Sequence, residues 1–103
     1  MDEKDFSLRL AQLREKKGVS ARDMSLSIGQ NPGYINNIES GKSMPSLSGI
    51  FYICEYLGIT PGEFFDQENN DPVKTAEVIS NIKRLDDKQL NAVSVIIKEI
   101  LKK

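Results

Sequence analysis

The sequence contains no histidine, and its 103 residues include a single cysteine, Cys54. The commonest general base and metal ligand is therefore missing, and one cysteine cannot form an internal disulfide or a zinc-binding cluster. A Gly-rich phosphate-binding loop is also absent, and the acidic residues form no motif with catalytic spacing. We expect no catalytic residue, no metal, no cofactor and no enzymatic activity, and Cys54 to be a buried, inert thiol rather than a nucleophile.

Long apolar segments are absent as well. No run of about 18 apolar residues exists to span a membrane. The first residues, MDEKDF, are acidic where a signal peptide needs a basic start followed by an apolar segment. We therefore expect a protein with no membrane partner that stays in the cytoplasm, of a bacterium or its mobile elements, and one cysteine fits that reducing compartment.

Positive charge is scarce for a protein that would bind nucleic acid. The formal net charge is −1, and residues 1–66 contain seven basic and nine acidic side chains, a net charge of −2. Such a chain has no overall attraction to phosphate, so any basic patch has to be local.

The segment spanning residues 20–42 predicts two short helices joined by a tight turn. Ser20 can cap the first helix, with Asp23 completing a capping box, and a glycine can end it. Asn31 can cap the second helix, whose first turn holds Pro32. Two helices of about two turns joined in this way form the helix-turn-helix that places one helix in a DNA major groove.

Helical patterns flank this pair on both sides. One helix is expected over about residues 3–17, with Gly18 at its end, and a fourth helix is expected to begin at Pro45 or Ser46 and to end at Gly58. Thr60 and Glu63 signal the start of a short fifth helix. The apolar positions expected to form the core of these three helices are Phe6, Leu8, Leu10, Ala11, Leu13, Leu47, Ile50, Ile53 or Cys54, Leu57, Phe64 and Phe65.

The composition changes in a polar run that ends at Pro72, which predicts a domain over residues 1–66, a linker over 67–72 and a tail over 73–103. Two amphipathic helices are expected in the tail, and Asp86 and Gln89 signal the start of the second. The last helix carries the apolar positions Leu90, Val93, Ile96, Ile97, Ile100 and Leu101. This apolar surface needs a partner, either a second copy of the chain or the chain's own first domain, and we favour dimerisation.

Several residue types recur at fixed offsets, in the order Leu10-x-x-Leu13-Arg14, Gly18-Val19-Ser20, Met24-x-x-x-Ile28-Gly29, Tyr34-Ile35-x-x-Ile38-Glu39-x-Gly41-Lys42, Pro45 and Leu57-Gly58. This order resembles that of the lambda-repressor-like, Cro/Xre type of helix-turn-helix regulators over about residues 6–66. The resemblance implies an all-α fold, with a five-helix DNA-binding domain followed here by two C-terminal helices. It also implies a structural ion pair between Arg14 and Glu39.

The resemblance further assigns the residues that would contact DNA. Base-reading positions of the family fall on Asn31, Pro32, Gly33 and Asn37, and Tyr34 lies on the same outward face, where it could contact the backbone or a thymine methyl. Residues expected at phosphates are Ser20, Arg22, Asn36, Lys42 and Ser43, with Arg22 and Lys42 as solvated charges the alternative.

The sequence departs from the family pattern at two points. Ala21 stands where family members often carry a glutamine that touches phosphate and base, and Pro32 and Gly33 replace side chains that would read bases. We accordingly expect sparse base readout, with some specificity from DNA shape.

The expected function is a sequence-specific transcriptional regulator, a repressor that binds double-stranded DNA at a palindromic operator as a homodimer. The alternative is a protein-interaction module, such as an antitoxin with a weakened DNA-reading face whose C-terminal helix binds a protein partner.

Overall fold

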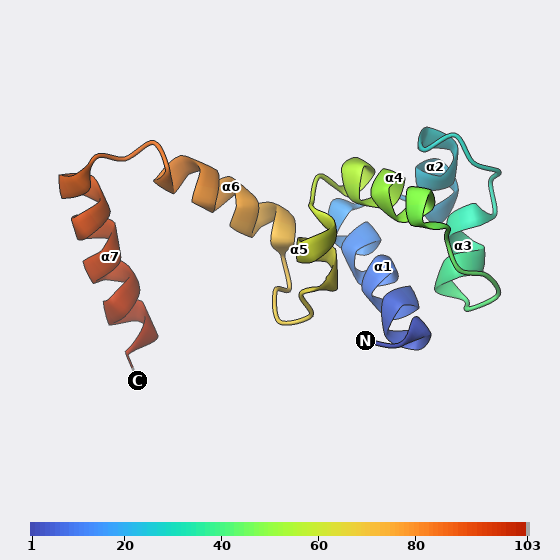
Figure 1. Cartoon of the computed structure of the whole chain (residues 1–103), viewed down its shortest axis with the longest axis horizontal. Helices are drawn as coiled ribbons and strands as arrows, with labels where there is room; N and C mark the ends of the chain where they lie inside the picture. The colour runs from blue at the N-terminus through green and yellow to red at the C-terminus, as the bar shows by residue number, and fades with distance from the viewer. Residues whose placement is uncertain (103) are drawn as a thin grey trace. The chain divides into compact units, whose positions relative to one another are not determined.

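The structure is a computed structural model that describes residues 1–102, and this part of the chain contains seven helices and no strand (Figure 1). The helices are α1 Glu3–Lys17, α2 Ala21–Ser27, α3 Tyr34–Glu39, α4 Leu47–Leu57, α5 Pro61–Phe65, α6 Pro72–Ile82 and α7 Asp87–Leu101. The all-α fold class is therefore confirmed. The chain divides into a compact unit from Met1 to Val73 and a second one that begins at Lys74.

Local signals in the sequence set the ends of several helices. Helix α1 ends at Gly18, which adopts the left-handed conformation with φ 77°, and α4 ends in the same way at Gly58, with φ 75°. A residue with a Cβ atom is strained in this conformation, so glycine suits both positions. At the start of α5, Thr60 and Glu63 form the predicted capping box, in which each side chain accepts a hydrogen bond from the other residue's backbone N–H.

The core of the first unit gathers apolar side chains from α1 to α5. Its buried members are Phe6, Leu10, Leu13, Met24, Ile35, Ile38, Ile53, Cys54, Leu57, Ile59 and Phe64. The rings of Phe6 and Phe64 pack with centroids 4.9 Å apart, which joins α1 to α5. In this way one core holds the two helices of the helix-turn-helix in place.

Three expected core positions are wrong. Leu8 is 59% exposed and Leu47 is 68% exposed, because α1 and α4 each bury a narrower stripe than the apolar pattern predicted. Phe65 is 45% exposed while its neighbour Phe64 is fully buried, since consecutive residues of a helix point in different directions.

The second unit has no buried side chain in α7. Helix α7 starts at a capping box between Asp86 and Gln89, as the sequence predicted, whereas α6 begins at Pro72, inside the predicted linker. Apolar side chains on α7 stay exposed, with Ile97 at 43% and Ile100 at 75%. Among the described residues, no helix combines the length and the apolar character needed to cross a membrane.

Candidate nucleic-acid interface

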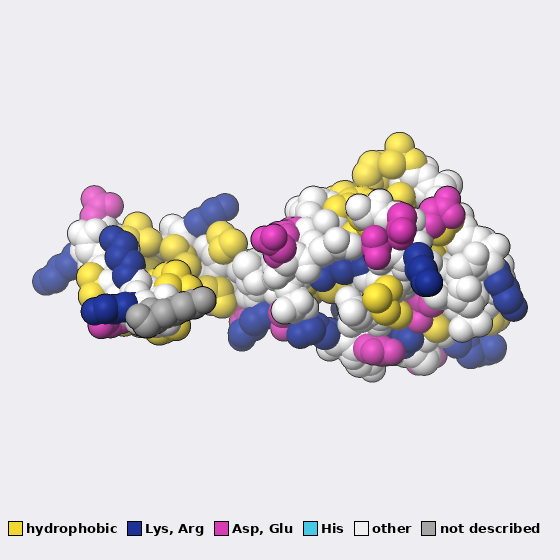
Figure 2. Space-filling model, turned by 90° about the horizontal axis from the view of Figure 1, so that it is seen from below, with side chains coloured by type: hydrophobic (Ala, Val, Ile, Leu, Met, Phe, Trp, Pro, Cys, Tyr) yellow, Lys and Arg dark blue, Asp and Glu magenta, His cyan; other side chains and the backbone are white. Residues whose placement is uncertain are grey.

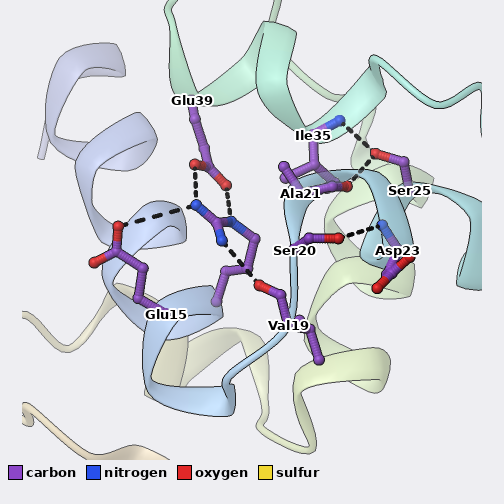
Figure 3. Close-up of polar contacts among 9 residues, drawn as sticks. Glu15, Val19, Ser20, Ala21, Asp23, Ser25, Ile35 and Glu39 are labelled. Atoms are coloured by element: carbon purple, nitrogen blue, oxygen red, sulfur yellow. Dashed lines mark hydrogen bonds and ion pairs between the residues drawn. The ribbon is translucent and has the colours of Figure 1, made fainter.

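Helices α2 and α3 form a helix-turn-helix that is fastened at its centre by Ser25. The hydroxyl of Ser25 donates to the Ala21 carbonyl at 2.7 Å and accepts the backbone N–H of Ile35 at 3.0 Å (Figure 3). Ser25 is completely buried, and Met24 and Ile35 are completely buried beside it. Because a buried polar group is stable only when it is bonded, this serine fixes the start of α3 against α2.

The far end of α3 is tied to α1 by the Arg14 and Glu39 side chains. Arg14 Nε donates to Glu39 Oε2 at 2.7 Å and Arg14 Nη2 donates to Glu39 Oε1 at 2.9 Å, while Nη1 donates to the Val19 carbonyl at 2.9 Å (Figure 3). Both side chains are mostly buried, and the hydrogen bond to Glu39 raises the pKa of Arg14 further. The structure thus joins the two residues that the family resemblance paired, in a two-pronged geometry that fixes orientation.

The turn between α2 and α3 is built differently from the sequence prediction. Asn31 was expected to cap α3, but α3 begins at Tyr34 and its cap position is Gly33, which makes no side-chain cap. The Asn31 side chain instead accepts the N–H of Gly33 at 3.0 Å, and its carbonyl accepts the N–H of Tyr34 at 3.1 Å. Asn31 prefers this local turn because its short amide can bond to a backbone N–H two residues on. Asn31 and Pro32 are therefore exposed on the turn that leads into α3.

Helix α2 shows a smaller departure. The Ser20 hydroxyl accepts the N–H of Asp23 at 3.0 Å, as predicted. The structure gives α2 this hydroxyl cap alone, whereas α1, α5 and α7 have complete capping boxes. The Ser20 side chain is thus engaged in capping, although the residue is exposed.

Asn36 and Asn37 present amide groups along α3. Asn36 is exposed and Asn37 is partly buried, with its amide nitrogen close to the turn residue Gly33. The Asn37 carbonyl accepts backbone N–H groups from Lys42 at 2.9 Å and Ser43 at 3.2 Å, so the loop after α3 closes back on the helix. Only the backbone groups of Lys42 and Ser43 take part in these two bonds, and both residues are exposed at the end of α3.

Tyr34 does not take the outward position expected of it. It packs against the core, and its hydroxyl oxygen lies so close to Gly49 in α4 that a Cβ atom there would be 2.6 Å away. Burial accordingly raises the pKa of the Tyr34 phenol. The hydroxyl is therefore directed at α4.

Most of the seven basic side chains in the first 66 residues already have partners within the fold. Arg14 bonds Glu39, Arg9 bonds backbone carbonyls, Lys16 lies 3.8 Å from Asp71, and the Lys17 ammonium lies 5.0 Å from the centre of the Tyr56 ring. Arg22 and Lys42 are exposed at the two ends of the helix-turn-helix. On the face drawn in Figure 2, Lys and Arg side chains are interspersed with Asp and Glu, and no broad basic patch forms.

Sequence reasoning missed two polar side chains of α1 that organise this domain. Arg9 is 4% exposed, and its guanidinium donates to the carbonyls of Glu63, Phe64 and Asp66 at 2.8 to 3.0 Å. Ser7 donates to the Ile38 carbonyl at 2.6 Å, which ties α1 to α3. The position of Arg9 could have indicated that it is buried. It lies three residues after a buried apolar residue, Phe6, and so falls on the same face of the helix.

The described residues hold no cluster of three or more side chains that could bind a metal ion. Cys54 is buried, and burial raises the pKa of its thiol to about 11. A thiol in this environment is protonated at neutral pH and is a poor nucleophile.

Comparison with known proteins identifies the domain. The family described as helix-turn-helix domain matches residues 8–70, more than half of the 103-residue chain. No curated protein and no solved structure matches the chain. The match covers the buried Ser25 link and the Arg14–Glu39 pair that hold α2 and α3 together. The chain therefore belongs to the helix-turn-helix domain family, a class of DNA-binding regulators.

Proposed function

We propose that this protein is a sequence-specific transcriptional regulator of the lambda-repressor-like, Cro/Xre type, and that it acts as a repressor in the cytoplasm of a bacterium. The observation that carries the proposal is the fixed helix-turn-helix, in which α3 is bonded to α2 through Ser25 and to α1 through Glu39. A short helix held at both ends can enter a major groove in one defined orientation.

Base readout is assigned to the turn and first part of α3, with Asn31, Pro32, Gly33 and Asn37 as the contacting residues. The amide of Asn37 can donate to and accept from adenine in a bidentate pair, which discriminates by about 1–3 kcal/mol. Pro32 and Gly33 allow the backbone to approach the bases closely. With few side chains available, the remaining specificity is expected from DNA shape.

Phosphate contacts are assigned to residues on either side of the base-reading surface, namely Ser20, Arg22, Asn36, Lys42 and Ser43. Exposure of Arg22 and Lys42 at opposite ends of the helix-turn-helix supports this assignment. Since the other cations of the domain are mostly engaged, affinity for arbitrary DNA should be modest.

The proposed repressor is a homodimer in which residues 1–66 bind DNA, 67–72 link and 73–103 dimerise. Exposed apolar side chains support this role for α7, since a monomer would leave them in water. The dimerising residues are Leu90, Val93, Ile96, Ile97, Ile100 and Leu101. A two-fold dimer can place two α3 helices in successive major grooves, about 34–36 Å apart, on one face of a palindrome.

The experiment that tests this function is selection from a randomised duplex pool by the purified full chain, at about 100 mM salt. Recovery of a palindrome with half-sites about 10 base pairs apart supports a dimeric, sequence-specific regulator. If folded protein enriches no sequence, the proposed function is wrong.

A second function is favoured by the scarcity of free cations in the domain. In this alternative the protein is an interaction module, such as an antitoxin, whose C-terminal helix binds a protein and whose DNA face is weakened. The dependence of duplex binding on salt separates the two, because a phosphate-binding protein loses affinity steeply as salt rises and an interaction module does not bind at any salt concentration.

A further inference from the structure

The start of α3 rests on the start of α4 through Tyr34 and Gly49. Gly49 is buried in the first turn of α4, where its N–H donates to the Ser46 hydroxyl at 3.1 Å. A Cβ atom at position 49 would lie 2.6 Å from the Tyr34 hydroxyl oxygen and 3.2 Å from Pro45 Cβ. Because non-bonded carbon and oxygen atoms do not approach this closely, the hydroxyl of Tyr34 occupies the space that a side chain at Gly49 would need.

Helix α3 depends on such external contacts. It has six residues, and its cap residue, Gly33, forms no side-chain hydrogen bond. A helix of this length is not stable by itself, so its orientation is set by what it packs against. Glu39 holds its last turn and Ser25 holds Ile35 N–H, but neither of these contacts involves α4.

We propose that Tyr34 is a positioning residue for DNA recognition: seated over Gly49, it sets the angle and depth at which the start of α3 offers Asn31, Gly33 and Asn37 to the bases. Gly49 is the second part of this arrangement, because it has no side chain and so leaves room for the Tyr34 hydroxyl. The inference rests on the proposed function, and it replaces the direct DNA contact expected of Tyr34 with an indirect effect on its neighbours.

The geometry defines a pair of substitutions that should compensate each other. Gly49→Ala places a methyl group against the Tyr34 hydroxyl and should displace the start of α3. Since the three atoms nearest to the added Cβ are the Tyr34 hydroxyl oxygen, Pro45 Cβ and the Ser46 hydroxyl oxygen at 3.4 Å, every ring carbon of Tyr34 is at least that far away. Tyr34→Phe therefore removes the severe clash and keeps the ring, and the double variant should regain most of the original orientation.

Gly62→Ala is the matched control. Gly62 lies in the first turn of α5, and the nearest atom to a Cβ atom there is the Thr60 hydroxyl oxygen at an unstrained 3.7 Å. It reproduces the Gly-to-Ala change in a helix, with its effect on backbone entropy, and does not touch α3.

The first measurement is the ratio of binding to the selected site over binding to random duplex, in full-length variants whose folding is checked by circular dichroism. We expect Gly49→Ala to lower this ratio on the order of 10-fold, the size of one lost bidentate base contact, and Gly49→Ala/Tyr34→Phe to recover most of it. A purely structural defect would lower both affinities together and leave the ratio unchanged. An unchanged ratio in Gly49→Ala, or a double variant no better than Gly49→Ala, would overturn the inference.

The second measurement, amide chemical shifts of residues 31 and 33–37, needs no DNA. Shifts displaced in Gly49→Ala and restored in the double variant support the positioning of α3 by Tyr34. If the wild-type protein selects no sequence, the proposed function and the role in base recognition fail, while this positioning still stands. If Gly49→Ala does not fold, a folded double variant supports the inference and an unfolded one overturns it.

Discussion

At the scale of single residues, the domain is organised by polar side chains that are buried with their hydrogen bonds made. Ser7, Arg9 and Ser25 are each at most 6% exposed. Ser7 donates to a carbonyl of α3, Arg9 to a carbonyl of α5, and Ser25 to a carbonyl of its own helix, α2. Among the described residues, no buried side-chain nitrogen or oxygen lacks a hydrogen-bond partner. Since removing one partner leaves the other unsatisfied, substitution of any of these three residues should destabilise the domain.

Two residues of the proposed interface should respond differently to substitution. Asn37→Ala removes the side-chain amide but keeps the backbone carbonyl that holds the loop after α3, so it should relax base preference at one position by about 1–3 kcal/mol.

Lys42→Ala should weaken binding almost equally on all sequences and reduce the slope of log affinity against log salt by about 1. Titrations of matched and random duplexes at several salt concentrations measure both effects, with Lys98→Ala on α7 as the control. If neither variant differs from wild type, the assignment of α3 to the groove is wrong.

The buried thiol gives a prediction about pH. Because burial raises the pKa of Cys54 to about 11 from an ordinary value of 9.0, the unfolded chain holds fewer protons than the folded one between these pH values. The free energy of unfolding should therefore fall as pH rises through this window, by at most about 2–3 kcal/mol. Urea unfolding of wild type and Cys54→Ala at pH 8 and pH 10 isolates the contribution of the thiol. An equal loss of stability in both proteins would contradict the prediction.

At the scale of helices, the ends were predictable where one or two adjacent residues decide them. Gly18 and Gly58 end α1 and α4, and the capping boxes at Thr60 and Asp86 start α5 and α7, because the deciding contacts span four residues or fewer. The predicted start of α3 was wrong. Asn31 could either cap a helix or stabilise a turn, and the sequence alone does not show which of the two it does.

The buried faces were predicted less well than the ends. Leu8 and Leu47 fit the apolar period of their helices yet lie exposed. Whether such a position is covered depends on segments elsewhere in the chain, which the local pattern does not report. Arg9 was missed for the converse reason, as its acceptors are carbonyls 54 to 57 residues later. The contact between Tyr34 and Gly49 likewise depends on how α3 and α4 pack, which no local pattern reports. The residues proposed to contact DNA were all named from the sequence, and their contacts with bases and phosphates stay predictions.

The link between α2 and α3 can be tested at this scale. Ser25→Ala leaves the buried N–H of Ile35 without its acceptor, so the free energy of unfolding should fall by about 1–3 kcal/mol. Ser27→Ala is the matched control, because this serine lies on the same helix but is exposed, and its effect should stay within about 0.5 kcal/mol. Urea denaturation followed by circular dichroism measures both. Equal stabilities of the two variants would show that the Ser25 bond does not fasten the helices.

At the scale of the whole molecule, the two units differ in how they bury apolar surface. The first unit has a continuous core, whereas α7 has no buried residue, and its large side chains are exposed at Val95, Ile96, Ile97, Ile100 and Leu101. Apolar atoms are visible along this unit in Figure 2 as well. Exposed apolar side chains of this kind are typical of a surface that binds a partner, which is why we assign dimerisation to the second unit.

Charged substitutions on α7 test that assignment. Ile97→Glu with Ile100→Glu should convert a dimer to a monomer, because burying two unpaired carboxylates at an interface is strongly unfavourable. Asn91→Glu is the control on the same helix, since Asn91 is polar and exposed and lies outside the proposed dimerising set. Light scattering after size-exclusion chromatography gives the masses. A monomeric wild-type protein would exclude the dimer, and a dimeric double variant would move the interface away from these residues.

The bonds of Arg9 also impose an order of events on synthesis. The chain leaves the ribosome from its N-terminus, so Arg9 emerges long before Glu63, Phe64 and Asp66, whose carbonyls receive its guanidinium. At about 5–20 residues per second, the delay is about 3–11 s. During that time a guanidinium that belongs in the interior has no acceptor to bury it, which disfavours closure of α1 onto the rest of the domain. A chain that stops before Glu63 lacks all three acceptors and would bury the Arg9 guanidinium without hydrogen bonds, so we expect its first helix to close onto the domain less favourably.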